Sequence, residues 1–216
     1  MSDDIDQFYQ DFFQDIRSSA DANGDFLEAS FVERFCGYLI DAGEFDTYDA
    51  GHYRAAKGMR VDGYAGDPIE ELGVLTLFIS DFNQDDKLAT LTKTDMTAIF
   101  KRLENFYIRA RDPNFCYELE ETSTGFGIAE MISSRVDDIN RVRFFLLSNR
   151  KLSERVTGVQ EGEIDGQPVT YHVWDFSRLN RMVASGKGKE DMDIDLVEEY
   201  QETIPCLPAH LSHGSY

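Results

Sequence analysis

Two aspartates stand at the ends of neighbouring β-like runs and could together hold a divalent metal ion. Asp62 ends a run in "KGMRVDG", and Asp81 directly follows the apolar run "VLTLFIS". Carboxylates on adjacent strand ends bind hard cations such as Mg²⁺ through oxygen. The cation then polarises a phosphate and lowers the pKa of a bound water, which attacks it. An aspartate beside glycine at a strand end is also an ordinary turn residue, so the pair is either a metal site or two turn residues.

Length and composition place this chain among single-domain globular proteins. Its 216 residues are 42% hydrophobic, which is enough for a sizeable core. No apolar run is long enough to span a bilayer, and the acidic N-terminus has no basic or apolar signal-peptide region. Three widely separated cysteines without a CxxC pair are typical of a reducing compartment. We therefore expect a cytoplasmic protein with no membrane partner, and the four histidines show no zinc-ligand spacing.

The charge is strongly acidic and unevenly distributed. The chain carries 41 acids against 21 bases, a net charge of −20. Such a charge disfavours binding of nucleic acid over the whole surface, because that binding depends on neutralising phosphates. Residues 1–50 hold 13 acids against two bases, whereas 135–155 holds six bases against three acids. A local basic surface on an acidic protein therefore stays open.

Two helices are expected to precede the rest of the fold. Apolar residues at spacings of three and four predict an amphipathic helix over 4–20. Asp25 is the expected N-cap of a second helix, with Glu28 three residues on as its capping-box partner. Gly43 is the expected residue just beyond the end of that helix.

The period of the pattern changes after this helical pair. Short runs between Gly, Pro and acids predict two or three antiparallel strands over 50–82, and the doubly apolar run over 74–80 predicts a central strand. The expected later elements are a crossover helix from Thr94 or Asp95 to Arg111, a helix at 126–138, a strand at 141–149, a hairpin at 162–176 with an Asp-Gly turn, and a short helix behind it. This order predicts an α/β fold with a mixed central sheet flanked by helices.

The order of several segments resembles a known family. The segments are "DAGHYRAAKGMRVDGYAGD", "LTLFISDF", "RVRFFLLSNRKLS", "VTYHVWDFSRLNRM" and "IPCLPAHL". Together they resemble the N-terminal region of bacterial abortive-infection phage-resistance (AIPR) proteins over roughly residues 8–210. Because those proteins continue further, the chain is expected to be an isolated N-terminal domain or a truncated product. We divide it as one domain over 1–216, with a helical pair at 1–45, an α/β core at 46–185, and an acidic run and tail at 186–216.

That family region is in turn similar to the restriction-endonuclease-like fold, including the Mrr-type enzymes. The similarity implies an acid on a helix, an aspartate ending one strand, and an acid–x–Lys triplet ending the next. Glu33 would be the helix acid, and Asp62 and Asp81 would hold the metal. The triplet here reads Asp–Phe–Asn, so its lysine is absent, and Lys57 is the candidate substitute. Glu33, Asp62, Asp81 and Lys57 are therefore the candidate catalytic residues, with solvated helix, turn and surface roles as the alternatives.

Two functions follow from the resemblance. The first is an anti-phage domain with a degenerate nuclease-like fold that acts in recognition or protein interaction, with a partner protein or a further C-terminal part as effector. The alternative is an active DNA or RNA endonuclease that uses Mg²⁺. The charge and the altered triplet favour the first. Because two close carboxylates without a cation repel, we also expect Asp81→Asn to cost little stability.

Overall fold

The computed structural model describes residues 2–55, 58–153 and 159–185. Lys57 and the expected acidic run and tail at 186–216 lie outside the described residues. No helix within the described ranges is both long enough and apolar enough to cross a membrane.

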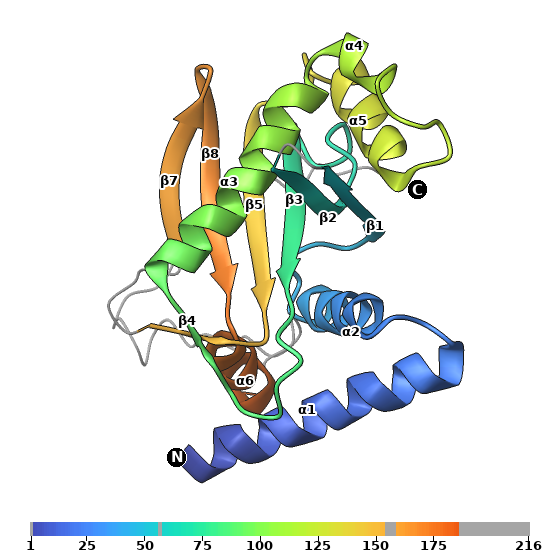
Figure 1. Cartoon of the computed structure of the whole chain (residues 1–216). Coiled ribbons are helices and arrows are strands. Elements are labelled where there is room, and N and C mark those ends of the chain that lie inside the picture. The colour runs from blue at the N-terminus through green and yellow to red at the C-terminus, as the bar shows by residue number, and fades with distance from the viewer. Residues whose placement is uncertain (1, 56–57, 154–158, 186–216) are drawn as a thin grey trace, which may run out of the picture.

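A six-stranded mixed sheet forms the centre of the fold (Figure 1). Its spatial order is β1 (Tyr48–Ala55), β2 (Met59–Ala65), β3 (Val74–Asp81), β5 (Arg141–Ser148), β8 (Gln167–Trp174) and β7 (Val159–Ile164). The first three strands form an antiparallel meander, β5 and β8 run parallel to β3, and β7 returns antiparallel to β8. The expected α/β class and mixed sheet are therefore confirmed.

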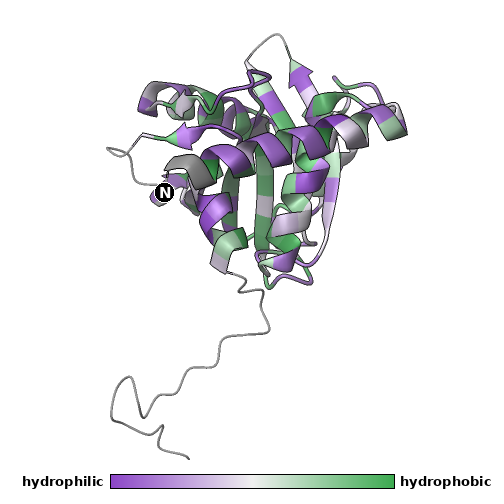
Figure 2. Ribbon diagram, turned by 90° about the horizontal axis from the view of Figure 1, so that it is seen from below, coloured by the Kyte–Doolittle hydropathy of each residue, from purple (hydrophilic) through white to green (hydrophobic). Residues whose placement is uncertain are grey.

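Helices cover both faces of the sheet and create two hydrophobic cores. The helices are α1 (Ser2–Asn23), α2 (Leu27–Asp41), α3 (Lys93–Ala110), α4 (Pro113–Cys116), α5 (Thr124–Ser134) and α6 (Phe176–Ser185). One core joins α1, α2 and α6 to one face of the sheet, and the other joins α3, α4 and α5 to the opposite face. Figure 2 shows the corresponding pattern, with largely hydrophobic central strands behind helices whose outer surfaces are mainly hydrophilic.

The central strand β3 belongs to both cores, as its unbroken apolar run predicts. Thr76 is 4% exposed and Phe78 is fully buried. Phe78 packs with the core of α1 and α2, whereas Leu77 and Ile79 pack with the core of α3. Because side chains alternate along a strand, consecutive residues at the end of β3 must also point to opposite faces of the sheet.

The turn of the predicted hairpin is confirmed. Asp165 and Gly166 link β7 to β8 with φ values of 50° and 82°. Two consecutive residues with positive φ are what a tight hairpin turn requires, and Asp-Gly is a favoured pair for it.

Helix starts were predicted less well than strands. The helix α2 begins at Leu27, and its N-cap is Phe26, which makes no side-chain capping bond; the predicted Asp25 cap is wrong. The N-cap of α3 is Thr92, which forms a capping box with Asp95. A further two-stranded sheet of β4 (Thr90–Leu91) and β6 (Lys151–Leu152) has no signal in the sequence pattern, because it rests on a long-range parallel pairing of two short segments.

Candidate functional site

The buried carboxylate of Asp62 is the centre of a polar network on β2. Asp62 is 3% exposed. Its Oδ2 accepts hydrogen bonds from the Ser80 backbone N–H at 2.6 Å and from the Ser80 hydroxyl at 3.0 Å. Its Oδ1 lies 2.5 Å from Nδ1 of His52. A buried charge must be paired and hydrogen-bonded to be tolerated, and these contacts meet part of that need.

The guanidinium of Arg60 joins Asp62 to a second acid on helix α2. Arg60 donates from Nε to both oxygens of Asp62 at 3.0 and 3.1 Å. Its Nη2 lies 2.5 Å from Oε1 of Glu28 and 2.8 Å from Oδ2 of Asp62. Only 11% of the Arg60 side chain is exposed. One fixed cation therefore bridges two carboxylates that come from different elements.

Ser80 completes the link between the helix and the sheet. Its hydroxyl lies 2.8 Å from Oε1 of Glu28 and 3.0 Å from Oδ2 of Asp62. A hydroxyl has one proton to donate, so Ser80 can serve only one of these carboxylates at a time. Arg60 donates further hydrogen bonds in the network, including one from Nη2 to the hydroxyl oxygen of Ser80 at 2.7 Å.

The network changes the acidity of its members in directions that follow from these contacts. Burial opposes ionisation of Asp62, but the hydrogen bond from His52 and the charge and hydrogen bonds of Arg60 outweigh it, so the pKa of Asp62 lies below its usual value. The hydrogen bond to Asp62 raises the pKa of His52 above its usual value, against the effect of burial. Both shifts favour an ionised Asp62 beside a protonated His52.

An irregularity in strand β1 brings His52 to this network. The pairing of β1 with β2 shifts register between Ala50 and Tyr53, so the strand carries a bulge at this point. Bulges are common beside functional sites because they redirect a side chain. The adjacent Gly51 lies against α5: a Cβ added there would lie 3.0 Å from Cβ of Thr124. A side chain at position 51 would therefore make a tight contact with α5, and Thr124 would have to shift to accept it.

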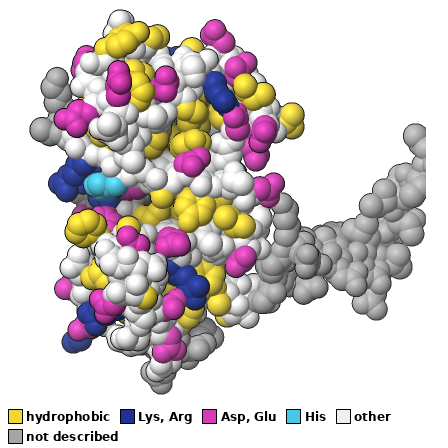
Figure 3. Space-filling model, turned by 90° about the vertical axis from the view of Figure 1, so that its right-hand side faces the viewer, with side chains coloured by type: hydrophobic (Ala, Val, Ile, Leu, Met, Phe, Trp, Pro, Cys, Tyr) yellow, Lys and Arg dark blue, Asp and Glu magenta, His cyan; other side chains and the backbone are white. Residues whose placement is uncertain are grey.

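The network forms the polar floor of a cavity of about 650 Å³. The floor consists of Glu28, His52, Asp62 and Ser80. The remaining lining is mostly apolar: Phe26, Leu27, Ala29, Val32, Ala50, Gly51, Gln84 and Thr124. Apart from Gln84, which follows β3, these residues come from the start of α2, from β1 and from the start of α5, on the face shown in Figure 3, where hydrophobic side chains gather across the middle of the surface.

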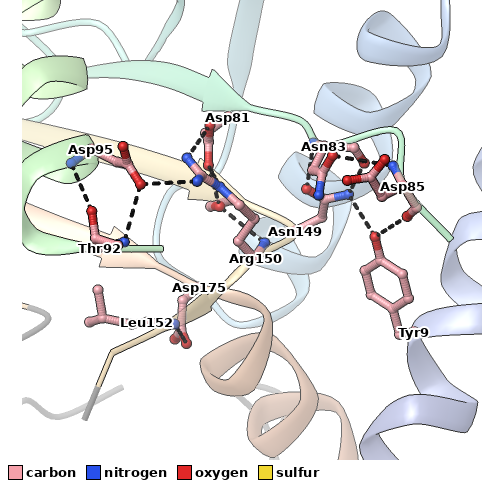
Figure 4. A network of polar contacts seen from close by, with 11 residues as sticks. Tyr9, Asp81, Asn83, Asp85, Thr92, Asp95, Asn149, Arg150, Leu152 and Asp175 are labelled. Carbon is pink, nitrogen blue, oxygen red and sulfur yellow. Dashed lines mark hydrogen bonds and ion pairs between the residues drawn. The ribbon is translucent and has the colours of Figure 1, made fainter. Parts of the chain in front are cut away.

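Asp81 lies on the other face of the sheet from Asp62. Its Oδ2 accepts a hydrogen bond from Ser148 at 2.7 Å, and both of its oxygens pair with Arg150 at 2.7 and 2.8 Å. Arg150 also contacts Asp95 at the start of α3 (Figure 4). Ser80, which contacts Asp62, and Asp81 are consecutive residues of β3, so their side chains point to opposite faces of the sheet. The structure therefore does not bring Asp62 and Asp81 together.

Of the other two predicted residues, only Glu33 lies among the described residues, and it is outside the network. Glu33 is exposed on α2 and lines a separate polar depression with Asp15 and Arg34. Lys57 lies outside the described residues, and a catalytic role for both stays a prediction. The helix acid that reaches the network is Glu28, which sequence reasoning had assigned to a helix cap; its position nearer to the apolar stripe was the available signal.

The network does not have the chemistry of a Mg²⁺ site. No group of three or more His, Cys, Asp or Glu side chains that could hold a metal exists among the residues that the structure describes. The oxygens of Asp62 already accept from His52, Ser80 and Arg60. Mg²⁺ needs near-octahedral oxygen ligands. Here the guanidinium of Arg60 is hydrogen-bonded to the carboxylates of both Glu28 and Asp62.

Comparison with known families identifies the domain. Residues 31–181, from α2 into α6, match the family model of the abortive infection phage resistance protein N-terminal domain. The chain belongs to this family. Membership implies an abortive-infection phage-resistance protein, as the sequence resemblance predicted. The match to this abortive-infection domain includes His52, Asp62 and Ser80 but begins after Glu28. No curated protein and no solved structure matches the chain.

Proposed function

We propose that this abortive-infection domain acts in recognition or protein interaction on a nuclease-like scaffold, and does not hydrolyse phosphodiesters. The observation that carries the proposal is the contact of Arg60 with both Glu28 and Asp62. A metal-dependent nuclease would need a divalent cation to lie between such carboxylates and activate water. Arginine stays protonated in proteins, so it neutralises the acids permanently but provides no metal-bound water.

The order of elements supports the scaffold. The helix α2 is followed by the meander β1, β2 and β3, by the crossover helix α3, and by β5 parallel to β3. This is the order that the restriction-endonuclease-like resemblance leads one to expect, with acids supplied by the helix and by the second strand. Glu28 and Asp62 stand in those two places and converge.

The third strand supplies the strongest sign of degeneration. The residue of β3 that contacts Asp62 is Ser80, so the acid–x–Lys triplet is best aligned with Ser80, Asp81 and Phe82. Neither the acid nor the lysine is then present. Phe82 instead stacks on Phe31 with ring centroids 5.0 Å apart. A side chain that anchors α2 to the sheet replaces one that would position or deprotonate water.

The alternative is a metal-dependent nuclease, which one observation favours. Glu28 is 40% exposed at the edge of the cavity, and it approaches the buried Asp62 through a shared partner. If Arg60 left its place, these two carboxylates would face one another and could take a cation. The expected cofactor of this alternative is Mg²⁺.

The two functions are separated by a cleavage assay. Purified protein is incubated with single- and double-stranded DNA and RNA in the presence of Mg²⁺ or Mn²⁺, beside Asp62→Ala and Asp81→Asn. Asp41→Asn is the matched control, because Asp41 is an exposed acid on the same helix as Glu28. We expect no metal-dependent cleavage by any of these proteins. Cleavage that disappears in Asp62→Ala and persists in Asp41→Asn would refute the proposal.

A further inference from the structure

We propose that the cavity above the Asp62 network binds a flat, uncharged heteroaromatic ligand of the nucleoside type. The inference deepens the proposed recognition function and rests on it. Three properties of the cavity lead to this ligand class: its apolar walls, the hydrogen-bonding groups of its floor, and an exposed aromatic ring at its rim.

The size and lining of the cavity are those of a small-molecule site. Its volume of about 650 Å³ lies within the range of about 300–1,000 Å³ that is usual for ligand pockets. Such pockets are mostly apolar and have a few polar groups that fix the ligand's orientation. Leu27, Val32 and Ala50 belong to the apolar part of the lining, and Glu28 and His52 belong to the floor.

Glu28 supplies the floor with a hydrogen-bond acceptor. Both described contacts of Glu28, from Arg60 and from Ser80, are made to Oε1. With 40% of this side chain exposed, its Oε2 is available to a ligand N–H. An ionised carboxylate accepts hydrogen bonds and does not donate them, so the ligand must carry a donor at this point.

His52 supplies the complementary group. Its Nδ1 faces Asp62, which as a carboxylate can only accept, so Nδ1 must carry a proton. Nε2 is then the remaining nitrogen of a ring whose side chain is 54% exposed. Protonated Nε2 donates to a ligand carbonyl or ring nitrogen. A ligand that carries both a donor and an acceptor fits these two groups, and nucleobases carry both.

The charge of the floor favours an uncharged ligand. The two acids, Glu28 and Asp62, are paired with Arg60, and Asp62 also lies 2.5 Å from Nδ1 of His52, a contact that favours the protonated imidazole. A charged group brought to this site would lose water without gaining an unpaired counter-charge, and such burial is unfavourable. The net charge of −20 opposes the phosphate of a nucleotide as well.

Phe26 provides a surface for the ring of the ligand. It is 87% exposed and lines the cavity beside Leu27. Its backbone is fixed as the N-cap of α2, with φ −75° and ψ 143°. Bases stack on exposed aromatic rings at protein surfaces with little dependence on base identity, so this ring would strengthen binding without setting specificity.

The experiment measures binding of adenosine, guanosine, cytidine and uridine, and of their 5′-monophosphates, to the full chain by calorimetry and by ligand-observed NMR. Phe26→Ala removes the ring, and Ala29→Trp fills the cavity from an exposed helix position. Leu72→Ala is the matched control, because Leu72 is 90% exposed and is not among the lining residues. We expect saturable binding of at least one nucleoside, weakened about tenfold by Phe26→Ala, abolished by Ala29→Trp and unchanged by Leu72→Ala.

Three results would overturn the inference. They are absence of binding for all four nucleosides up to their solubility limits, binding that Phe26→Ala and Ala29→Trp leave unchanged, and tighter binding of the nucleoside monophosphate than of the nucleoside. If the protein binds no nucleoside and cleaves no nucleic acid, the proposed ligand class is rejected and the proposed recognition function is not. Metal-dependent cleavage rejects the proposed function, whatever the nucleoside result.

Discussion

Replacing Arg60 by alanine tests whether this side chain holds the network together. The change removes the only described cation that contacts both Glu28 and Asp62. Asp62 would keep its hydrogen bonds from Ser80 and His52 but would remain buried, at 3% exposure, with less positive charge around it. Removing one partner of a buried ion pair is costly because the other charge stays desolvated.

The expected loss follows from the exposure of the two acids. Breaking a buried pair costs about 3–5 kcal/mol, and we take the lower end, about 3 kcal/mol, because Glu28 is partly exposed and screened by water. For a chain of this size that corresponds to a fall in Tm of about 6–12 °C. Arg109→Ala is the control, since its pair with Glu118 is exposed on both sides and should contribute at most about 1 kcal/mol.

Urea unfolding and thermal melts of the two variants measure this difference. Mn²⁺ or Mg²⁺ should raise the Tm of Arg60→Ala and leave that of the parent protein unchanged, because only the variant leaves Glu28 and Asp62 without their cation. Equal stability losses in Arg60→Ala and Arg109→Ala would refute the reasoning. Metal stabilisation of the parent protein would show that Arg60 does not block the site.

Three further outcomes are expected. In an NMR titration, the pKa of His52 should lie above 6.5, so its contribution to stability is full below pH 6.5 and is lost as the pH rises through the folded pKa. The pKa of His172 should be lowered to about 4, because the ring is buried and lies near arginines. His172 therefore has the opposite effect, and stability is lost as the pH falls from 6.5 towards 4. Asp81→Asn should cost about 1–3 kcal/mol in urea unfolding, because it weakens a two-point ion pair with Arg150; this reverses the small cost expected from sequence, and an unchanged midpoint would contradict it. Phe78→Ala should cost about 3–5 kcal/mol, since Phe78 is fully buried; a loss below about 1 kcal/mol would mean that the core collapses around it.

The elements that carry their own local pattern could be predicted from the sequence. The run over 74–80 is apolar on both faces, and it forms the doubly buried strand β3. The pair Asp165-Gly166 forms the hairpin turn because its backbone chemistry is local. Family membership likewise followed from the order of short segments, each readable without knowledge of its neighbours in space.

The composition of the site was decided by the tertiary structure. Sequence spacing singled out Asp62 but paired it with Asp81, which points to the opposite face of the sheet. It gave no reason to place Arg60 between two acids, or to bring His52 to Asp62 through a bulge.

The physical reason is the difference between local and long-range interactions. Periodicity and turn preferences depend on a few consecutive residues. A network such as that of Glu28, Arg60 and Asp62 depends on how a helix is oriented over a sheet, on strand register, and on which face each residue occupies. A shift of one residue in register reverses every side chain of a strand. The sequence by itself therefore determined the strands of the central sheet and the family, and only the packing of α2 against β1, β2 and β3 determined which side chains meet.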